Sequence, residues 1–353
     1  MSRLLAVLPV ALALVLAAPA AADEPAAAAE APAPRPQWGR GPLEVRDPFI
    51  LSLSRLSPWA RSPAVAPHLG GEVGVRGVWT NSYAFADNRY VLDAEVRQLW
   101  AYARVGGWDR VELGLHLPYE WRGGGVMDGF IEGFHDAFGL PDMDRDRRPR
   151  DRFLVRGVER DGSVFSLDHP GYGFSDLIVE PRVLLHRGDD LLPAASLTVR
   201  LRLPTGRRKF QLSDGVDASL ALDLSKRLGA LPLVAYATLA YTYHAHAHVG
   251  GLTLARHRFM AALGLEWEIT PVVSFVVHAW LETPNVRGLY SDPPPPGVGR
   301  ADLSFGNYVS YVAVGFKAEP VPGLIVDLGI LENILDPETT ADFGVLASVA
   351  YRF

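Results

Sequence analysis

The chain has 353 residues, of which 48% are hydrophobic, with a formal net charge of −6 and no cysteine. The lack of cysteine excludes a disulfide framework, a cysteine metal site and the lipid-anchored cysteine of a bacterial lipoprotein. The negative charge gives no support for a nucleic-acid partner, and we expect none.

The first residues have the features of a secretory leader. Arg3 supplies a positive charge, residues 4–16 form an apolar run, and "APAAAD" follows with small side chains. The run is too short to span a membrane, and we predict a signal peptide over residues 1–22 that is cleaved on export.

Two segments precede the first predicted strand. Residues 23–42 are rich in alanine and proline, and they lack the apolar content to fold, so we expect a flexible linker. Residues 43–71 are more apolar and are interrupted by proline. They could form an irregular plug or an extra strand.

From residue 72 onward, about twelve segments alternate between apolar and polar residues. Each is close to the ~9–11 residues that a tilted membrane strand needs. They lie near residues 72–83, 90–104, 109–122, 173–187, 194–204, 216–227, 231–246, 257–269, 272–284, 303–317, 323–333 and 341–353. We therefore predict an all-β fold, an antiparallel transmembrane β-barrel of about 12 strands over residues 72–353.

The connections between these segments alternate in length. "VGGW", "GDDLLP", "LGA", "TP" and "EPVPG" are short, whereas residues 123–172 and 283–302 form long connections. Short turns on one rim and long loops on the other are typical of an outer-membrane barrel, with the short turns in the periplasm. We predict a monomeric, porin-like barrel in the outer membrane of a Gram-negative bacterium.

The longest connection contains a helical pattern over residues 129–139. Phe130, Ile131, Phe134 and Phe138 share one face, and Gly139 followed by Pro141 ends the helix. About ten residues do not hold a helix alone in water, so this apolar face must be buried. The helix could cover the barrel mouth as a lid or lie in the outer leaflet as an interfacial anchor. We predict the lid.

A run of arginines and aspartates follows the helix. Its arginines, Arg145, Arg147, Arg148, Arg150 and Arg152, could bind lipopolysaccharide phosphates, which would make this lipid a partner. Alternatively, the run is a solvated loop whose own aspartates neutralise it.

The polar faces of the strands carry many charges. Side chains of a strand point alternately to its two faces. If the apolar faces meet lipid, the polar side chains must therefore point into the lumen. This predicted lumen charge network consists of Asp93, Glu95, Arg97, Glu112, Glu120, Glu180, Arg182, Arg200, Arg202, Asp223, Glu266, Glu268 and Glu282. Such a network could select solutes by charge or could fill and stiffen the barrel.

Sites for a metal or for catalysis have weaker signals. His244, His246 and His248 share a strand face, where two of them could hold a metal ion, or they form a polar rim. Ser274 and His278 lie two pleats apart, too far for a direct hydrogen bond. We expect no enzyme and no cofactor.

The last strand ends in an aromatic pair. Tyr351 and Phe353 lie on the face that would meet lipid. They look like the terminal signal by which outer-membrane proteins are recognised, so we expect the barrel-assembly machinery as a partner during biogenesis.

The stretch "GGVMDGFIEGFHDAFGLPDMDRDRRPRDRF" resembles an uncharacterised Gram-negative family described as a domain of unknown function (number 3187). The resemblance also covers "RDPFILSLSRL" and the downstream strands. It implies an outer-membrane barrel and adds no activity.

From these patterns we predict passage or binding of a small solute or lipid through a charged lumen. The alternatives are a non-conducting barrel that displays loops or binds an envelope partner, and a membrane-embedded lipid hydrolase.

Overall fold

The computed structural model describes residues 38–53, 55–86, 90–139, 145, 149–158, 164–167, 169–206, 215–246, 248–249, 252–285, 308–333 and 340–353. The predicted signal peptide and residues 23–37 of the predicted linker lie outside the described residues.

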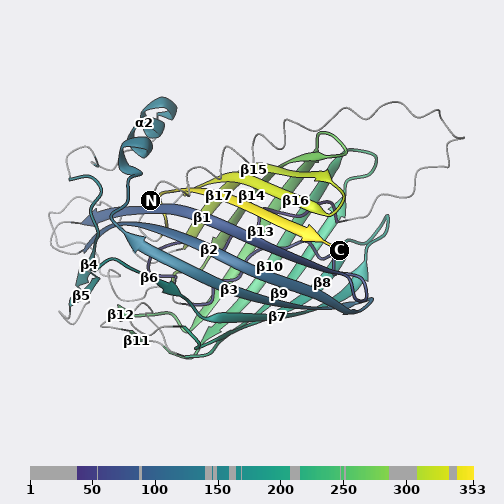
Figure 1. Ribbon diagram of the computed structural model, residues 1–353, viewed down its shortest axis with the longest axis horizontal. Helices are drawn as coiled ribbons and strands as arrows, with labels where there is room; N and C mark the ends of the chain where they lie inside the picture. The colour runs from purple at the N-terminus through teal and green to yellow at the C-terminus, as the bar shows by residue number, and fades with distance from the viewer. Residues whose placement is uncertain are drawn as a thin grey trace, which may run out of the picture.

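Twelve strands form a closed antiparallel ring (Figure 1). Each strand pairs with the next one in the ring, and β17 pairs with β1 to close it, with Val75 opposite Val349. The predicted fold class is therefore confirmed. The ring strands are β1 (Gly71–Ala86), β2 (Tyr90–Trp108), β3 (Val111–Gly123), β7 (Leu177–Arg187), β8 (Ala194–Leu203), β9 (Asp217–Arg227), β10 (Leu233–His244), β13 (His257–Glu268), β14 (Val273–Glu282), β15 (Val309–Val321), β16 (Leu324–Glu332) and β17 (Phe343–Arg352).

Short elements decorate one end of the barrel. β4 (Leu154–Val158) pairs with β2 and with β5 (Val164–Leu167), and β6 (Gly171–Phe174) pairs with β3. β11 (His248–Val249) and β12 (Leu252–Thr253) form a small hairpin. Together with α2 (Asp128–Phe138), they lie at the end opposite the C-terminus (Figure 1). In the described part of the chain, no helix is long and apolar enough to cross a membrane.

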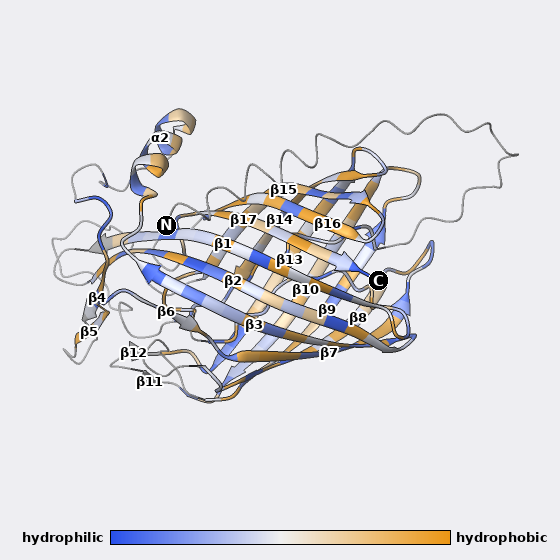
Figure 2. Cartoon of the chain, viewed as in Figure 1, coloured by the Kyte–Doolittle hydropathy of each residue, from blue (hydrophilic) through white to orange (hydrophobic). Residues whose placement is uncertain are grey.

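The strands follow the expected alternation (Figure 2). In β8, buried Arg200 and Arg202 alternate with partly exposed leucines and valine. In β13, Leu263 is 71% exposed, while its neighbour Ala262 is buried. An outer face of this kind presents apolar side chains to lipid and leaves polar ones for the interior.

Residues 38–66, apart from residue 54, lie inside the barrel, and residues 67 and 68 are exposed at the rim. Residues 38–68 are called the inner segment below. Arg40 contacts the carbonyl of Pro271 in a short turn, whereas the Leu51 carbonyl accepts a 2.8 Å hydrogen bond from Asn285 at the opposite end. The segment then returns, and His68 bridges to Gly106 near the short-turn rim. The inner segment therefore runs through the barrel and back. It adds no strand to the ring among its described residues.

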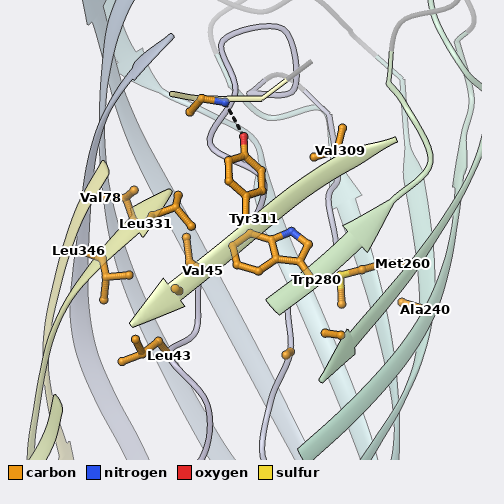
Figure 3. Close-up of a cluster of buried hydrophobic side chains, with 14 of the residues drawn as sticks. Leu43, Val45, Val78, Ala240, Met260, Trp280, Val309, Tyr311, Leu331 and Leu346 are labelled. Atoms are coloured by element: carbon orange, nitrogen blue, oxygen red, sulfur yellow. Dashed lines mark hydrogen bonds between the residues drawn. The ribbon is translucent and has the colours of Figure 1, made fainter. Parts of the chain in front are cut away.

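Apolar side chains of the inner segment pack against the inward face of the wall (Figure 3). Leu43 and Val45 join a buried cluster that includes Trp280, Tyr311 and Leu346. The backbone N–H of Ala341 donates a 2.6 Å hydrogen bond to the Tyr311 hydroxyl beside this cluster. In this part of the lumen the side chains are thus packed together as they are in a protein core.

The position of α2 differs from the predicted lid. Ile131 packs with Met127 and Phe343, next to Trp79 and Val345. Trp79 and Val345 alternate with inward-facing Val78 and Leu346, so the helix lies on the outer face of β1 and β17. The buried side of the helix follows Met127, Ile131 and His135, with Phe134 partly buried against Phe343, whereas Phe130 and Phe138 are 58% and 69% exposed.

Candidate functional site: the charged lumen and the inner segment

Ten of the predicted lumen charges do face inward. They lie on strand positions whose neighbours face outward, and most are fully buried. These residues are Glu112, Glu120, Glu180, Arg182, Arg200, Arg202, Asp223, Glu266, Glu268 and Glu282. A buried charged side chain is stable only with a partner, so each of these residues needs a hydrogen-bonding or oppositely charged group inside the barrel.

Arg61 of the inner segment lies at the centre of this network. Its Nη1 lies 3.1 Å from Oε1 of Glu112 and also contacts Glu180, and its Nε lies 3.5 Å from Oε1 of Glu44. One guanidinium from the inner segment therefore joins carboxylates of β3 and β7 to a carboxylate of the inner segment itself.

The wall arginines reach back to the inner segment. Arg200 donates to Glu180 at 2.6 Å and to the Trp59 carbonyl at 3.1 Å, and its guanidinium stacks on the Trp59 ring at 4.0 Å. Arg182 donates to the Ser62 carbonyl at 2.6 Å and to the Ala64 carbonyl at 3.0 Å. These contacts satisfy main-chain carbonyls that would otherwise be buried without partners.

A second group of contacts lies toward the long-loop end. Arg46 contacts Glu120 at 2.6 Å, and Arg258 contacts Glu282 at 2.8 Å and Asp47 at 3.5 Å. These contacts bind the outer half of the inner segment to both sides of the barrel wall.

An apolar cluster closes the same end. Phe49, Ile50, Leu51 and Leu53 of the inner segment are buried. They pack against side chains of β1, β2, the β4–β5 hairpin and a long loop, namely Ala84, Tyr90, Leu92, Ala94, Val96, Val155, Phe165 and Leu254. We call this cluster the outer seal.

The short-turn end is open. A cavity of about 760 Å³ lies there, between the inner segment and the rim. Its lining includes Arg40, Arg61 and Arg104 as well as Glu44 and Glu72. Both signs of charge are present, so the cavity has no single preferred sign for a bound solute.

The predicted inward direction of Asp93, Glu95 and Arg97 is wrong. In β2 the exposed residues include Leu99 and Ala101, and therefore odd-numbered positions face outward. The lumen instead receives Gln98, Trp100, Tyr102 and Arg104. The outward charges are covered near the rim: Glu95 accepts a 2.7 Å hydrogen bond from Trp79 and accepts from the backbone N–H of Met127. Arg97 stacks between Trp79 and Trp121.

The three histidines predicted as weak metal candidates do not form one cluster in the described structure. His244 is buried, and its Nδ1 lies 2.9 Å from Oδ2 of Asp217, which also contacts Arg202. His246 is exposed, and the side chain of His248 lies outside the described residues.

Ser274 and His278 both face inward on β14. The Ser274 hydroxyl accepts a 2.7 Å hydrogen bond from Arg40, and His278 stacks on Trp280. The described contacts therefore do not join this serine to this histidine.

A separate polar cluster lies on the outer face, beneath α2. Arg145 is buried, contacts Asp128 and Asp342, and lies 4.1 Å from the centre of the Tyr83 ring. Nearby, the Glu332 carboxylate raises the pKa of His135. Arg145 is thus not exposed for lipopolysaccharide, whereas Arg150 is on the surface and pairs with Glu132 at 3.0 Å.

Sequence reasoning missed the arginines of the inner segment. Arg46, Arg55 and Arg61 lie in a stretch that is otherwise apolar, and each makes buried contacts with the wall or the long loops. Isolated arginines at such spacing in an apolar segment are the signal that could have indicated a partner with buried carboxylates.

Comparisons agree with this architecture. The model of a family described as "Protein of unknown function (DUF3187)" matches residues 26–353. No curated protein matches the sequence.

Among solved structures, the COG4313 outer membrane channel from Pseudomonas putida F1 is similar, with a TM-score of 0.52 and 12% identity over 82% of this chain and 97% of that one. The NanC porin has a TM-score of 0.41 and 10% identity, covering 80% and 98% of the two chains. The first similarity supports an outer-membrane barrel fold.

Proposed function

We propose that this chain, which belongs to the DUF3187 family, forms an outer-membrane passage for small polar solutes that the inner segment holds closed. The observation that carries this proposal is that the inner segment contacts a polar, charge-bearing surface of the barrel wall. The wall presents ionisable side chains to it, and Arg46 and Arg61 of the segment contact carboxyl groups of the wall.

The polar interface favours a segment that can move. A permanently filled barrel would lose nothing by packing apolar side chains in its interior, because buried ion pairs rarely stabilise a fold more than hydrophobic groups of similar size. A wall of charged side chains can instead be hydrated when the inner segment withdraws. The lumen would then remain a favourable path for water and polar solutes.

The two ends of the lumen differ as expected for a passage closed at one side. The outer seal contains side chains that are almost fully buried, whereas the cavity at the short-turn end holds about 760 Å³ of open space. Movement of the inner segment toward this cavity would break the seal without unfolding the ring.

A non-conducting barrel is the second candidate. The extensive contacts of the inner segment favour it, since Arg61 alone joins Glu44, Glu112 and Glu180. In that case the inner segment is a permanent part of the core, and the loops would carry the function.

Cross-linking distinguishes the two candidates. The Ser57 hydroxyl donates a 3.0 Å hydrogen bond to Glu282 of β14. The chain has no cysteine, so Ser57→Cys with Glu282→Cys creates a unique pair that a short, thiol-cleavable reagent can join. Each single variant, treated with the same reagent, is the matched control.

Solute entry is measured by swelling of liposomes that contain the folded protein. We expect neutral sugars to enter slowly before treatment, entry to stop when the pair is joined, and entry to return after cleavage. Swelling that occurs at the same rate in the joined and the cleaved protein would contradict gating by the inner segment. No swelling in any state would favour the non-conducting barrel.

A further inference from the structure

We propose that the outer face of the barrel, beneath α2, binds a divalent metal ion between His135, Glu332 and Asp342. One ligand atom of each residue lies within 4.8 Å of the others. The residues come from three places in the chain: the helix, the end of β16 and the position before β17. The inference is independent of the proposed passage.

The distances suit an ion better than a direct contact. Nε2 of His135 lies 3.8 Å from Oε1 of Glu332, too far for a hydrogen bond. With metal–ligand distances of about 2.0–2.2 Å, two ligands of a tetrahedral zinc ion are roughly 3.4 Å apart. A small closing of the existing gap would therefore place both atoms on one ion.

Burial gives an independent indication. His135 is 3% exposed, and neither ring nitrogen has a hydrogen-bond partner among the described residues. Oε2 of Glu332 is also buried without such a partner in the same part of the chain. Buried polar atoms nearly always have a partner, so these three atoms are available to a ligand.

The charges around the cluster have the sign that a cation needs. Arg145 is shared between Asp128 and Asp342, while Glu332 contacts His135. When an ion displaces the imidazole proton, the three carboxylates face one guanidinium, and the two charges of a divalent ion balance the remaining negative charge. Arg145 does not block the site, because a carboxylate has two oxygens and can bind a guanidinium and a metal together.

The backbone holds two ligands in place before the ion arrives. The N–H of Asp342 donates a 2.8 Å hydrogen bond to the Asn81 carbonyl of β1, and Glu332 is paired with Phe343 in the sheet. His135 comes from the helix and is held by the packing of Ile131 and Met127. An ion here would tie the long loop to the barrel wall.

The ligand set favours zinc. One imidazole and two carboxylates suit Zn²⁺, and three protein ligands leave a fourth position for water. Calcium and magnesium prefer oxygen ligands alone, so the histidine argues against both.

Titration of the full-length, tag-free protein in detergent tests the site. We expect calorimetry to show one Zn²⁺ per chain, and Co²⁺ to give the absorbance of a tetrahedral site. Either His135→Ala or Glu332→Gln should weaken zinc binding by at least tenfold. His246→Ala, which removes an exposed histidine at the rim, is the matched control and should bind as the wild type does.

A second measurement separates binding from folding. Heat-modifiable migration in gels shows whether each variant has formed the barrel. If His135→Ala does not fold, the Glu332→Gln variant alone tests the site. Zn²⁺ should slow trypsin cleavage at Arg150 in the wild type and not in the variants. The absence of saturable binding, or unchanged affinity in the folded His135→Ala and Glu332→Gln variants, would overturn the site. Loss of binding in His246→Ala would do so too, since the metal would then lie at the rim histidines.

Discussion

At the residue scale, the lumen depends on charges that are paired across great distances in sequence. Arg61 contacts Glu112 and Glu180, which lie 51 and 119 positions away along the chain. Each group alone would be costly to bury, since an ion loses its hydration when it leaves water. The inner segment and the wall therefore each supply the charged partners that the other needs while its charges are buried.

Removing the Arg61 charge should destabilise the barrel. We expect Arg61→Ala to cost about 3 kcal/mol, near the lower end for a broken buried ion pair, because Glu180 keeps its contact with Arg200. Urea titrations in lipid vesicles measure the free energy of unfolding.

The control is Arg150→Ala, which removes an exposed pair with Glu132 and should leave the free energy of unfolding nearly unchanged, because water already screens that pair. An equal cost for the two variants would mean that Arg61 is hydrated in the membrane-embedded protein and that the lumen is not closed around it.

At the element scale, the strands were predictable and the helix was not placed correctly. The ring strands lie close to the predicted ranges, because alternation with period two is a local signal. Which side of α2 is buried depends on partners such as Trp79 and Phe343 that lie far away in sequence, and the spacing of the phenylalanines does not reveal them. The same reason explains the error in β2, where Asp93, Glu95 and Arg97 imitate an inward face. Glu95 is covered by the start of the helical segment at Met127, and Arg97 by the rim tryptophans.

The placement of α2 predicts how its variants behave. Ile131→Asp puts a charge into the contact with Met127 and Phe343, so the helix should leave the wall. We expect faster trypsin cleavage at Arg150 and Arg152 on intact cells, with unchanged solute entry.

Phe138→Asp is the matched control, because Phe138 is exposed and its loss leaves the contact with the wall intact. Increased solute entry in Ile131→Asp would instead place the helix over the barrel mouth, as the sequence alone suggested.

At the scale of the whole molecule, the structure is a ring with an occupied interior. The ring could be predicted from alternation, loop lengths and the terminal aromatic residues. The course of the inner segment could not, because its irregular backbone has no periodicity and its polar partners extend from Arg76 to Lys317. The sequence left a plug and an extra strand as alternatives, and no local pattern distinguishes them.

Single-channel recording in planar bilayers tests the gated passage most directly. The wild type should show a closed baseline with rare openings. Leu51→Asp, which puts a charge into the outer seal, should open often and for longer, whereas Leu191→Asp in an exposed short turn should behave as the wild type does. A wild type that is steadily open, or a folded Leu51→Asp variant that never opens, would contradict a passage held closed by the inner segment.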